Sequence, residues 1–359
     1  MVKSNRIEYL DSIRGIAAMM VVFYHFIGWH WGETQTFHLA SLVFNGADAV
    51  SFFFVLSGFV LSYKYLHFDE ELNIKKYTYN RVWRLYPAFI VTILLNYLYW
   101  SRFNSGIDIL KEVFLNLHRP LWTELMMVRG QHMYYIPGWT LGIEMALSLL
   151  MPFLIIAAVK NIRLIWWFIP VSMFMGPQYI SPFTMHFCFG IILAYYYPQI
   201  KDYTFKESKY YSYRWLIALV VFLLFSIRHI ERMLGSFGKV YQKIAEFLKL
   251  DLFHFTGFAS FVILLFVINN QKVQDFLNGK ILHFIGKVSY SIYLMHWLIV
   301  VIIMERWERV VAFWGSTELA FATMLPFTII ATIASATFMY YFVEKPCIAY
   351  SKRVSSKFS

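Results

Sequence analysis

Long apolar segments alternate with short polar ones along almost the whole chain. A helix needs about 20 apolar residues to cross a bilayer. The sequence therefore predicts an all-α fold, a polytopic membrane bundle of about ten helices. The fifth and sixth spans have the weakest pattern, because prolines interrupt them. The predicted spans are residues 13–31, 47–66, 86–101, 137–159, 164–180, 182–198, 215–230, 251–269, 284–304 and 319–342.

Composition agrees with this pattern, since 59% of the residues are hydrophobic and only 15% are charged. The net charge of +11 does not indicate nucleic acid, because Lys and Arg form short clusters between apolar runs instead of one basic face. The segments expected to be cytoplasmic hold more of these residues, which predicts that both termini are cytoplasmic. Two cysteines, Cys188 and Cys347, predict neither a disulfide framework nor a metal site.

No soluble extracytoplasmic domain is apparent in the sequence. We expect one transmembrane domain over residues 1–345 and a short cytoplasmic tail over residues 346–359. The first apolar segment is too long for the core of a signal peptide, and no small-residue cleavage site follows it. It is interpreted as a retained membrane anchor.

The first predicted span contains two ionisable residues, Arg14 near its start and His25 inside it. Eleven residues of helix separate them, which is three turns and roughly 16 Å along one face. An ionisable residue in a membrane helix is a functional hypothesis. The alternative is that Arg14 extends to the lipid headgroups and that His25 packs through a hydrogen bond. The spacing by itself favours neither interpretation.

Two carboxylates are candidates to act with His25. Asp48 lies near the outer start of the second span, where it would orient His25 and stabilise its protonated form, or else cap the helix. Glu144 lies about two turns into the fourth span and is the only formal charge there, so it is expected to be paired, protonated or functional. Ser57 and Gly58, further along the second span, are interpreted as a close helix-packing point.

Two arginines precede the third span. Arg81 and Arg84 are three residues apart, which places both guanidinium groups on one helical face. Such a pair suits a phosphate or pyrophosphate, although the positive-inside rule alone also produces it. In the ninth span, a stripe of Ser289, Tyr293 and His296 forms either a hydrogen-bonded packing contact or part of a site.

These residues alone allow two classes of function. A transporter would use Arg14, His25, Asp48 and Glu144 as a substrate or proton path. An enzyme would use His25 as a base.

Six sequence fragments, in this order, resemble the membrane acyltransferase 3 family, the ten-span O-acyltransferases of bacterial surface sugars. The resemblance covers the whole chain. The fragments are Leu10 to Gly15 with Arg14 and His25, Gly46 to Asp48 with Phe54 to Phe59, Arg81 to Pro87, Trp139 to Glu144, Ser289 to His296, and Val343 to Pro346. The sequence has Ser12 where a glycine is common, and Thr140 and Gly142 in a segment that is usually richer in serine.

The resemblance implies that His25 is the catalytic base, supported by Asp48 or Glu144, and that Arg14, Arg81 and Arg84 bind the acyl donor. Trp139, Ser289, Tyr293 and His296 are candidates to support this site. The implied donor is acyl-coenzyme A, most simply acetyl-coenzyme A, acting as a co-substrate, with no permanently bound cofactor. The implied acceptor is a carbohydrate such as O-antigen, capsule or exopolysaccharide, lipid-linked or not, at the bacterial inner membrane.

Overall fold

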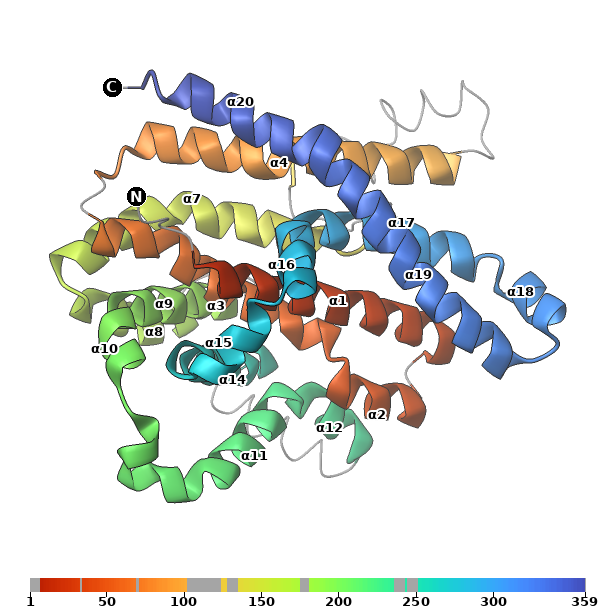
Figure 1. Cartoon of the computed structure of the whole chain (residues 1–359), viewed down its shortest axis with the longest axis horizontal. Helices are drawn as coiled ribbons and strands as arrows, with labels where there is room; N and C mark the ends of the chain where they lie inside the picture. Colours follow the sequence, from red (N-terminus) through yellow and green to blue (C-terminus); the bar gives the residue numbers. More distant parts are fainter. Residues whose placement is uncertain are drawn as a thin grey trace. The chain divides into compact units, whose positions relative to one another are not determined.

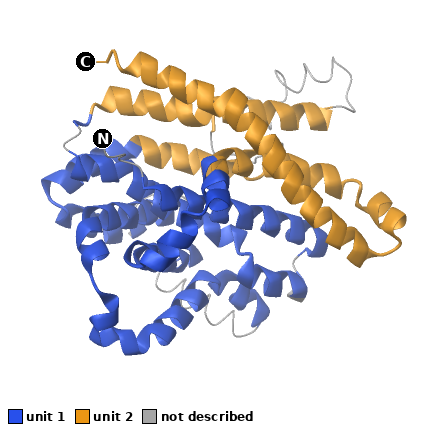
Figure 2. Cartoon of the chain, viewed as in Figure 1, with its two compact units in different colours: residues 1–72, 150–287 blue, residues 73–149, 288–359 orange. Residues whose placement is uncertain are grey.

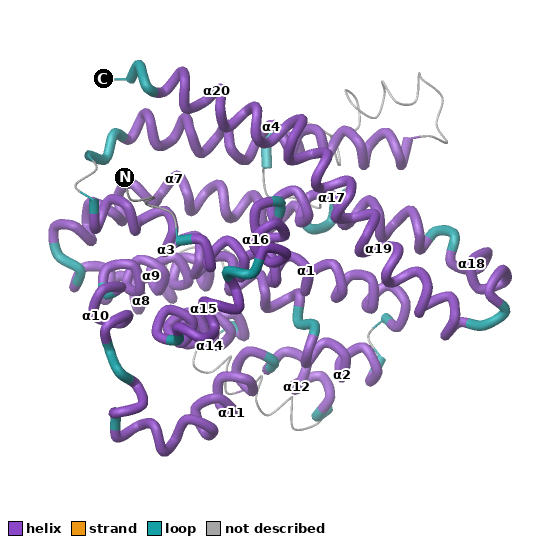
Figure 3. The backbone as a smooth tube through the Cα atoms, viewed as in Figure 1, coloured by secondary structure: helices purple, strands orange, loops and turns teal. Residues whose placement is uncertain are grey.

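The computed structural model describes residues 7–32, 34–68, 71–101, 124–127, 135–174, 181–235, 243 and 251–358. Their regular elements are helices, and no strand occurs among them (Figures 1 and 3). The predicted all-α fold is therefore confirmed for the described part of the chain.

The helices divide into two compact units, each built from two stretches of chain (Figure 2). Unit 1 comprises Met1–Leu72 and Leu150–Lys287, and unit 2 comprises Asn73–Leu149 and Val288–Ser359. Helix α7 runs through the boundary at Leu149 and Leu150.

The helices of unit 1 are α1 (Glu8–Trp31), α2 (Gln35–Val43), α3 (Gly46–His67), α8 (Arg163–Phe174), α9 (Ser181–Tyr195), α10 (Tyr197–Asp202), α11 (Arg214–Phe225), α12 (Ile227–Met233), α14 (Leu252–Asn269), α15 (Gln271–Leu277) and α16 (Lys280–Lys287). Two short 3₁₀ helices, η1 (Phe205–Glu207) and η2 (Lys209–Tyr213), precede α11. The helices of unit 2 are α4 (Ile74–Ser101), the first half of α7 (Gly138–Lys160), α17 (Ser289–Met304), α18 (Trp307–Trp314), α19 (Thr317–Met339), the π-helical turn η3 (Tyr340–Glu344) and α20 (Lys345–Ser355).

Six helical segments among the described residues are long and apolar enough to cross a membrane. A seventh is added if α16 and α17 count as one broken span, since the span predicted over residues 284–304 is interrupted at Val288. Three other predicted spans correspond to shorter helices, α8, α9 and α11, of 12, 15 and 12 residues. The helices fit a multi-pass membrane protein, while ten spans and cytoplasmic termini stay predictions.

Helix α3 lies at the centre of unit 1, in contact with α1, α9 and α14. Residues on most faces of α3 are buried, because the helix carries apolar residues all around its axis. The crossing with α9 is made by two glycines. A Cβ atom on Gly58 would lie 2.2 Å from the carbonyl oxygen of Phe187, and one on Gly190 would lie 2.1 Å from that of Val55. The close packing predicted at Gly58 is confirmed.

Replacing Gly58 with valine should separate α3 from α9, because the added atoms meet backbone and no flexible side chain is there to move aside. Overpacking of this kind costs about 1–3 kcal/mol and occasionally more. We expect a lower melting temperature and less monodisperse protein in detergent. Val60→Ile, at an exposed position of the same helix, is the control. Wild-type melting of Gly58→Val would show that the two helices do not need this contact.

A second glycine crossing joins α1 to α16. A Cβ atom on Gly15 would lie 2.6 Å from the backbone nitrogen of Gly286, and one on Gly286 would lie 2.4 Å from the backbone of Asp11. The two helices therefore touch backbone to backbone. This contact fixes the first turns of α1, which carry Arg14.

Candidate active site

His25 lies in the second half of α1 and is half-buried. Its ring contacts the ring of Tyr24, with centroids 5.5 Å apart. Helix α3 also lies near this part of α1, because its first residue, Gly46, packs directly on α1. A Cβ atom on Gly46 would lie 2.4 Å from the Cβ of Tyr24. The start of α3 therefore packs on Tyr24, the residue before His25, and on the preceding turn of α1.

Asp48 is in the first turn of α3 and is fully buried. Its Oδ1 accepts from Nε of Arg228, at 3.4 Å, and its backbone N–H donates to the side chain of Asn45, at 3.1 Å. The alternative prediction that Asp48 caps this helix is wrong, because Asn45 is the N-cap and its side chain satisfies one of the otherwise unpaired N–H groups of the first turn. No hydrogen bond joins Asp48 to His25 among the described residues. Support of His25 by Asp48 stays a prediction.

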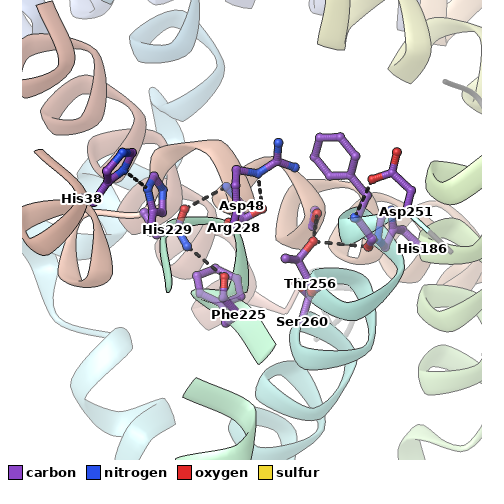
Figure 4. Close-up of polar contacts among 12 residues, drawn as sticks. His38, Asp48, His186, Phe225, Arg228, His229, Asp251, Thr256 and Ser260 are labelled. Atoms are coloured by element: carbon purple, nitrogen blue, oxygen red, sulfur yellow. Dashed lines mark hydrogen bonds and ion pairs between the residues drawn. The ribbon is translucent and has the colours of Figure 1, made fainter. Parts of the chain in front are cut away.

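Polar side chains of α2 and α12 continue from this ion pair (Figure 4). The buried rings of His38 and His229 meet through their Nδ1 atoms, at 3.3 Å, so one of them carries the proton and donates it. The side-chain nitrogen of Asn45 donates to the carbonyl of Phe225, at 2.8 Å, which ties the start of α3 to the end of α11. We call the five polar side chains the Asp48 cluster: His38, Asn45, Asp48, Arg228 and His229.

The Asp48 cluster is linked to the surroundings of His25 through one residue. The ring of Tyr24 lies 5.8 Å from the ring of His229, centroid to centroid, and also contacts His25. The guanidinium group of Arg228 lies over the ring of Phe253, 4.2 Å from its centroid. This cation–π contact holds the plane of the guanidinium group in place.

Arg14 is near the start of α1 and forms an ion pair with Asp11, one turn earlier, at 3.2 Å. Both side chains are largely covered, with 18% and 11% of their surface exposed. The structure thus places Arg14 and His25 on the same helix, as predicted, with Arg14 next to the contact of α1 with α16. Its predicted role in donor binding stays a prediction.

Arg81 and Glu144 are joined within unit 2. Arg81 of α4 donates from Nη2 to Oε1 of Glu144, at 2.5 Å, and from Nε to Oγ of Ser148, at 2.9 Å. Tyr77, one turn earlier on α4, donates to the carbonyl of Ser148, at 3.0 Å. The carboxylate that the sequence predicts to be paired, protonated or functional is therefore paired, and it attaches α7 to α4.

Arg84 lies one turn after Arg81 on α4 and is half-buried. No ion pair to Arg84 occurs among the described residues, in contrast to Arg81. Of the two predicted phosphate ligands, Arg84 therefore has the less occupied guanidinium group.

Tyr293 and His296 form a hydrogen-bonded stripe in α17. The hydroxyl groups of Tyr293 and Thr140 lie 2.6 Å apart, and Tyr135 donates to the carbonyl of Tyr293, also at 2.6 Å. Nδ1 of His296 lies 2.6 Å from that same carbonyl. Ser289 is buried at the start of this helix, and Trp139 is half-buried in the first turn of α7. These contacts are those of helix packing, and a supporting role in catalysis stays a prediction.

Sequence reasoning missed His38, Arg228 and His229. One signal was present, because Arg228 lies inside the span predicted over residues 215–230, and a charge in a membrane helix is expected to be paired or functional. His229 carries the same signal, because it lies in the same predicted span, whereas His38 lies between the first two predicted spans. The two histidines are 191 residues apart, and only the fold brings them together.

A family model described as an acyltransferase domain matches residues 7–343. The chain belongs to the acyltransferase 3 family. A curated relative, the O-acetyltransferase PaAT-1 of Phomopsis amygdali, is 30% identical over 151 residues, covering 33% of this chain. The match covers 30% of that relative's length. No solved structure matches the chain.

The family match includes all the polar residues described above. The match extends over both units and includes α1 with Arg14 and His25, the Asp48 cluster, and the joined Arg81 and Glu144. It favours an enzyme over the transporter that the buried charges also allowed.

Proposed function

We propose that this acyltransferase moves an acetyl group from acetyl-coenzyme A to a hydroxyl group of a surface or exported carbohydrate. The observation that carries the proposal is His25, half-buried in α1 of an acyltransferase and adjacent to Tyr24, on which the start of α3 packs. The relative named an O-acetyltransferase supports transfer to oxygen and supports acetyl as the group. O-antigen, capsule and exopolysaccharide, lipid-linked or not, are the acceptors proposed, at the bacterial inner membrane.

In the proposed reaction, the oxygen of a sugar hydroxyl attacks the thioester carbonyl while the neutral imidazole of His25 takes the hydroxyl proton. The tetrahedral intermediate collapses with cleavage of the carbon–sulfur bond. The leaving thiolate then takes the proton from the imidazolium, which gives the acetyl ester, coenzyme A as the thiol, and neutral His25. A thioester has a good leaving group, so the protein mainly aligns the reactants and stabilises the oxyanion.

The donor is proposed to bind through its phosphates. Arginine suits phosphate because its planar guanidinium group donates two parallel hydrogen bonds. Arg14, Arg81 and Arg84 are the candidates, and Arg84 has the least occupied side chain of the three. Direct transfer and a covalent relay through a protein nucleophile would use the same donor contacts.

Deletion of the gene should remove acetyl groups from a surface carbohydrate of the cell that carries it, and re-expression should restore them. Mass spectrometry of extracted glycans measures this. In a second arm, purified protein in a detergent without a sugar headgroup receives labelled acetyl-coenzyme A and carbohydrate extracted from the deletion strain. Label in the carbohydrate and release of the thiol are expected. Unchanged glycans together with no transfer in the purified system would contradict the proposal.

A further inference from the structure

Three polar atoms of the Asp48 cluster are buried and have no hydrogen-bond partner among the described residues. They are Oδ2 of Asp48, Nη2 of Arg228 and Nε2 of His229. Asp48 and His229 have no exposed surface at all. Most buried polar groups in native proteins are paired, and leaving one unpaired costs about 1–3 kcal/mol. Three such atoms in one cluster indicate a place built to receive a polar group.

These atoms come from two helices that are far apart in the sequence and are brought together by the fold. Asp48 starts α3, and Arg228 and His229 are consecutive on α12. Other contacts hold the three side chains in position. The Oδ1 atom of Asp48 accepts from Arg228, the guanidinium group of Arg228 lies over Phe253, and His229 meets His38. These contacts fix the three side chains, and with them the positions of Oδ2 of Asp48, Nη2 of Arg228 and Nε2 of His229.

The charges favour a neutral ligand. The carboxylate of Asp48 and the guanidinium group of Arg228 neutralise each other, so the pair offers one acceptor and one donor with little net charge. A hydroxyl group both donates and accepts, and neighbouring hydroxyl groups of a sugar ring satisfy such a pair together. A phosphate, which only accepts in its ionised form, would lie beside the carboxylate oxygen and be repelled. The cluster therefore suits a sugar better than the phosphates of the donor.

The Asp48 cluster lies close to His25, the proposed base. The ring of Tyr24 contacts the rings of both His25 and His229. A sugar held by the cluster is thus separated from the surroundings of His25 by one aromatic residue. Helices α2 and α12 also lie at the end of α1 that is predicted to face outward, where an exported acceptor would arrive.

We propose that Asp48, Arg228 and His229 form the binding subsite for the carbohydrate acceptor. Asp48 accepts from one sugar hydroxyl, Arg228 donates to its neighbour, and His229 bonds a third polar group of the same ring. This assignment rests on the proposed function, because it takes the acceptor to be a carbohydrate. It gives Oδ2 of Asp48, which has no hydrogen-bond partner among the described residues, a role that is distinct from supporting His25.

The test uses Arg228→Lys, which keeps a positive charge beside Asp48 but removes the second planar donor. Purified full-length protein is titrated with carbohydrate extracted from the deletion strain and, separately, with acetyl-coenzyme A. The apparent KM for the carbohydrate should rise about 10- to 100-fold, as expected for one lost hydrogen bond to a charged group. The apparent KM for acetyl-coenzyme A should change less than about twofold, since the proposal assigns the cluster to the acceptor and not to the donor.

A second variant, His229→Gln, tests the same assignment if Arg228→Lys does not fold, and it should raise the same KM. Arg232→Gln, at an exposed position of α12, is the matched control and should behave as wild type. An unchanged KM for carbohydrate in both variants would overturn the subsite, as would an equal rise in both KM values. Failure of the proposed function has a different result, in which the wild-type protein releases coenzyme A but labels no carbohydrate.

Discussion

Replacing His25 with alanine should lower acetyl transfer by about 10²- to 10⁴-fold, the usual contribution of a positioned general base. The loss should appear in kcat. The proton moves only in the transition state, so the KM for acetyl-coenzyme A should change little. The measurement is steady-state transfer of labelled acetyl groups by the purified variant. A thioester reacts with hydroxyl groups without a base, and for this reason a low residual rate is expected.

His30→Gln is a matched control for His25, because His30 lies on the same helix, also half-buried, within its last turn. It should keep wild-type transfer and a wild-type melting temperature. His25→Gln adds a second comparison, since glutamine keeps a hydrogen-bonding side chain but cannot take the proton at neutral pH. Wild-type turnover in both His25 variants would remove His25 from the mechanism. Loss of transfer together with aggregation in His25→Ala would require His25→Gln to decide between packing and catalysis.

The sequence predicts that the described segments are helices, and it predicts which ionisable residues lie in the first helix, because apolar periodicity is a local property of the chain. Helix α1 and its Arg14 and His25 are where the pattern puts them. The break at Val288 was not predicted, since the apolar run continues through it. Three predicted spans correspond to α8, α9 and α11, which are apolar but have 12, 15 and 12 residues, fewer than the roughly 20 that cross a bilayer. For these three helices the apolar pattern predicts a helix, and a membrane crossing stays a prediction.

Side-chain partners are harder to predict than helices, because they depend on contacts between distant segments. Gly58 indicates a close helix crossing, but nothing local in the sequence identifies Gly190 as the other half. The sequence suggests Asp48 as a support for His25 or as a helix cap. In the structure Asn45 is the cap and Asp48 pairs with Arg228, 180 residues away, while support of His25 stays a prediction. Glu144 was expected to need a partner, and the fold supplies Arg81. A charge in an apolar segment thus predicts that a partner exists, and only the tertiary structure identifies it.

Replacing Arg81 alone with methionine should destabilise the protein by about 3 kcal/mol. Removing one member of a buried ion pair leaves the other charge uncompensated, which costs about 3–5 kcal/mol. The lower end applies here because 21% of the Glu144 side chain is exposed, compared with 9% for Arg81. Arg81 also donates to Ser148, so its loss affects two contacts between α4 and α7. Unfolding in mixed detergent micelles measures the change.

The double variant Arg81→Met with Glu144→Met should recover most of that stability, because no buried charge is left and both side chains are apolar. A double-mutant cycle gives the coupling between the two positions. Arg84→Met, one turn further along α4, controls for loss of a charge and should cost much less, since Arg84 has no ion pair among the described residues. Strictly additive losses in the cycle would contradict a structural ion pair.

The same double variant separates the structural role of Arg81 from its proposed role in donor binding. If Arg81 also contacts the phosphates of coenzyme A, the stable double variant should still show a raised KM for acetyl-coenzyme A, and Arg84→Met should show one as well. If Arg81 only joins α4 to α7, the KM should return to the wild-type value together with stability, and Arg84→Met alone should raise it. The ion pair with Glu144 already occupies one edge of the Arg81 guanidinium group, so we expect the larger rise in KM for Arg84→Met.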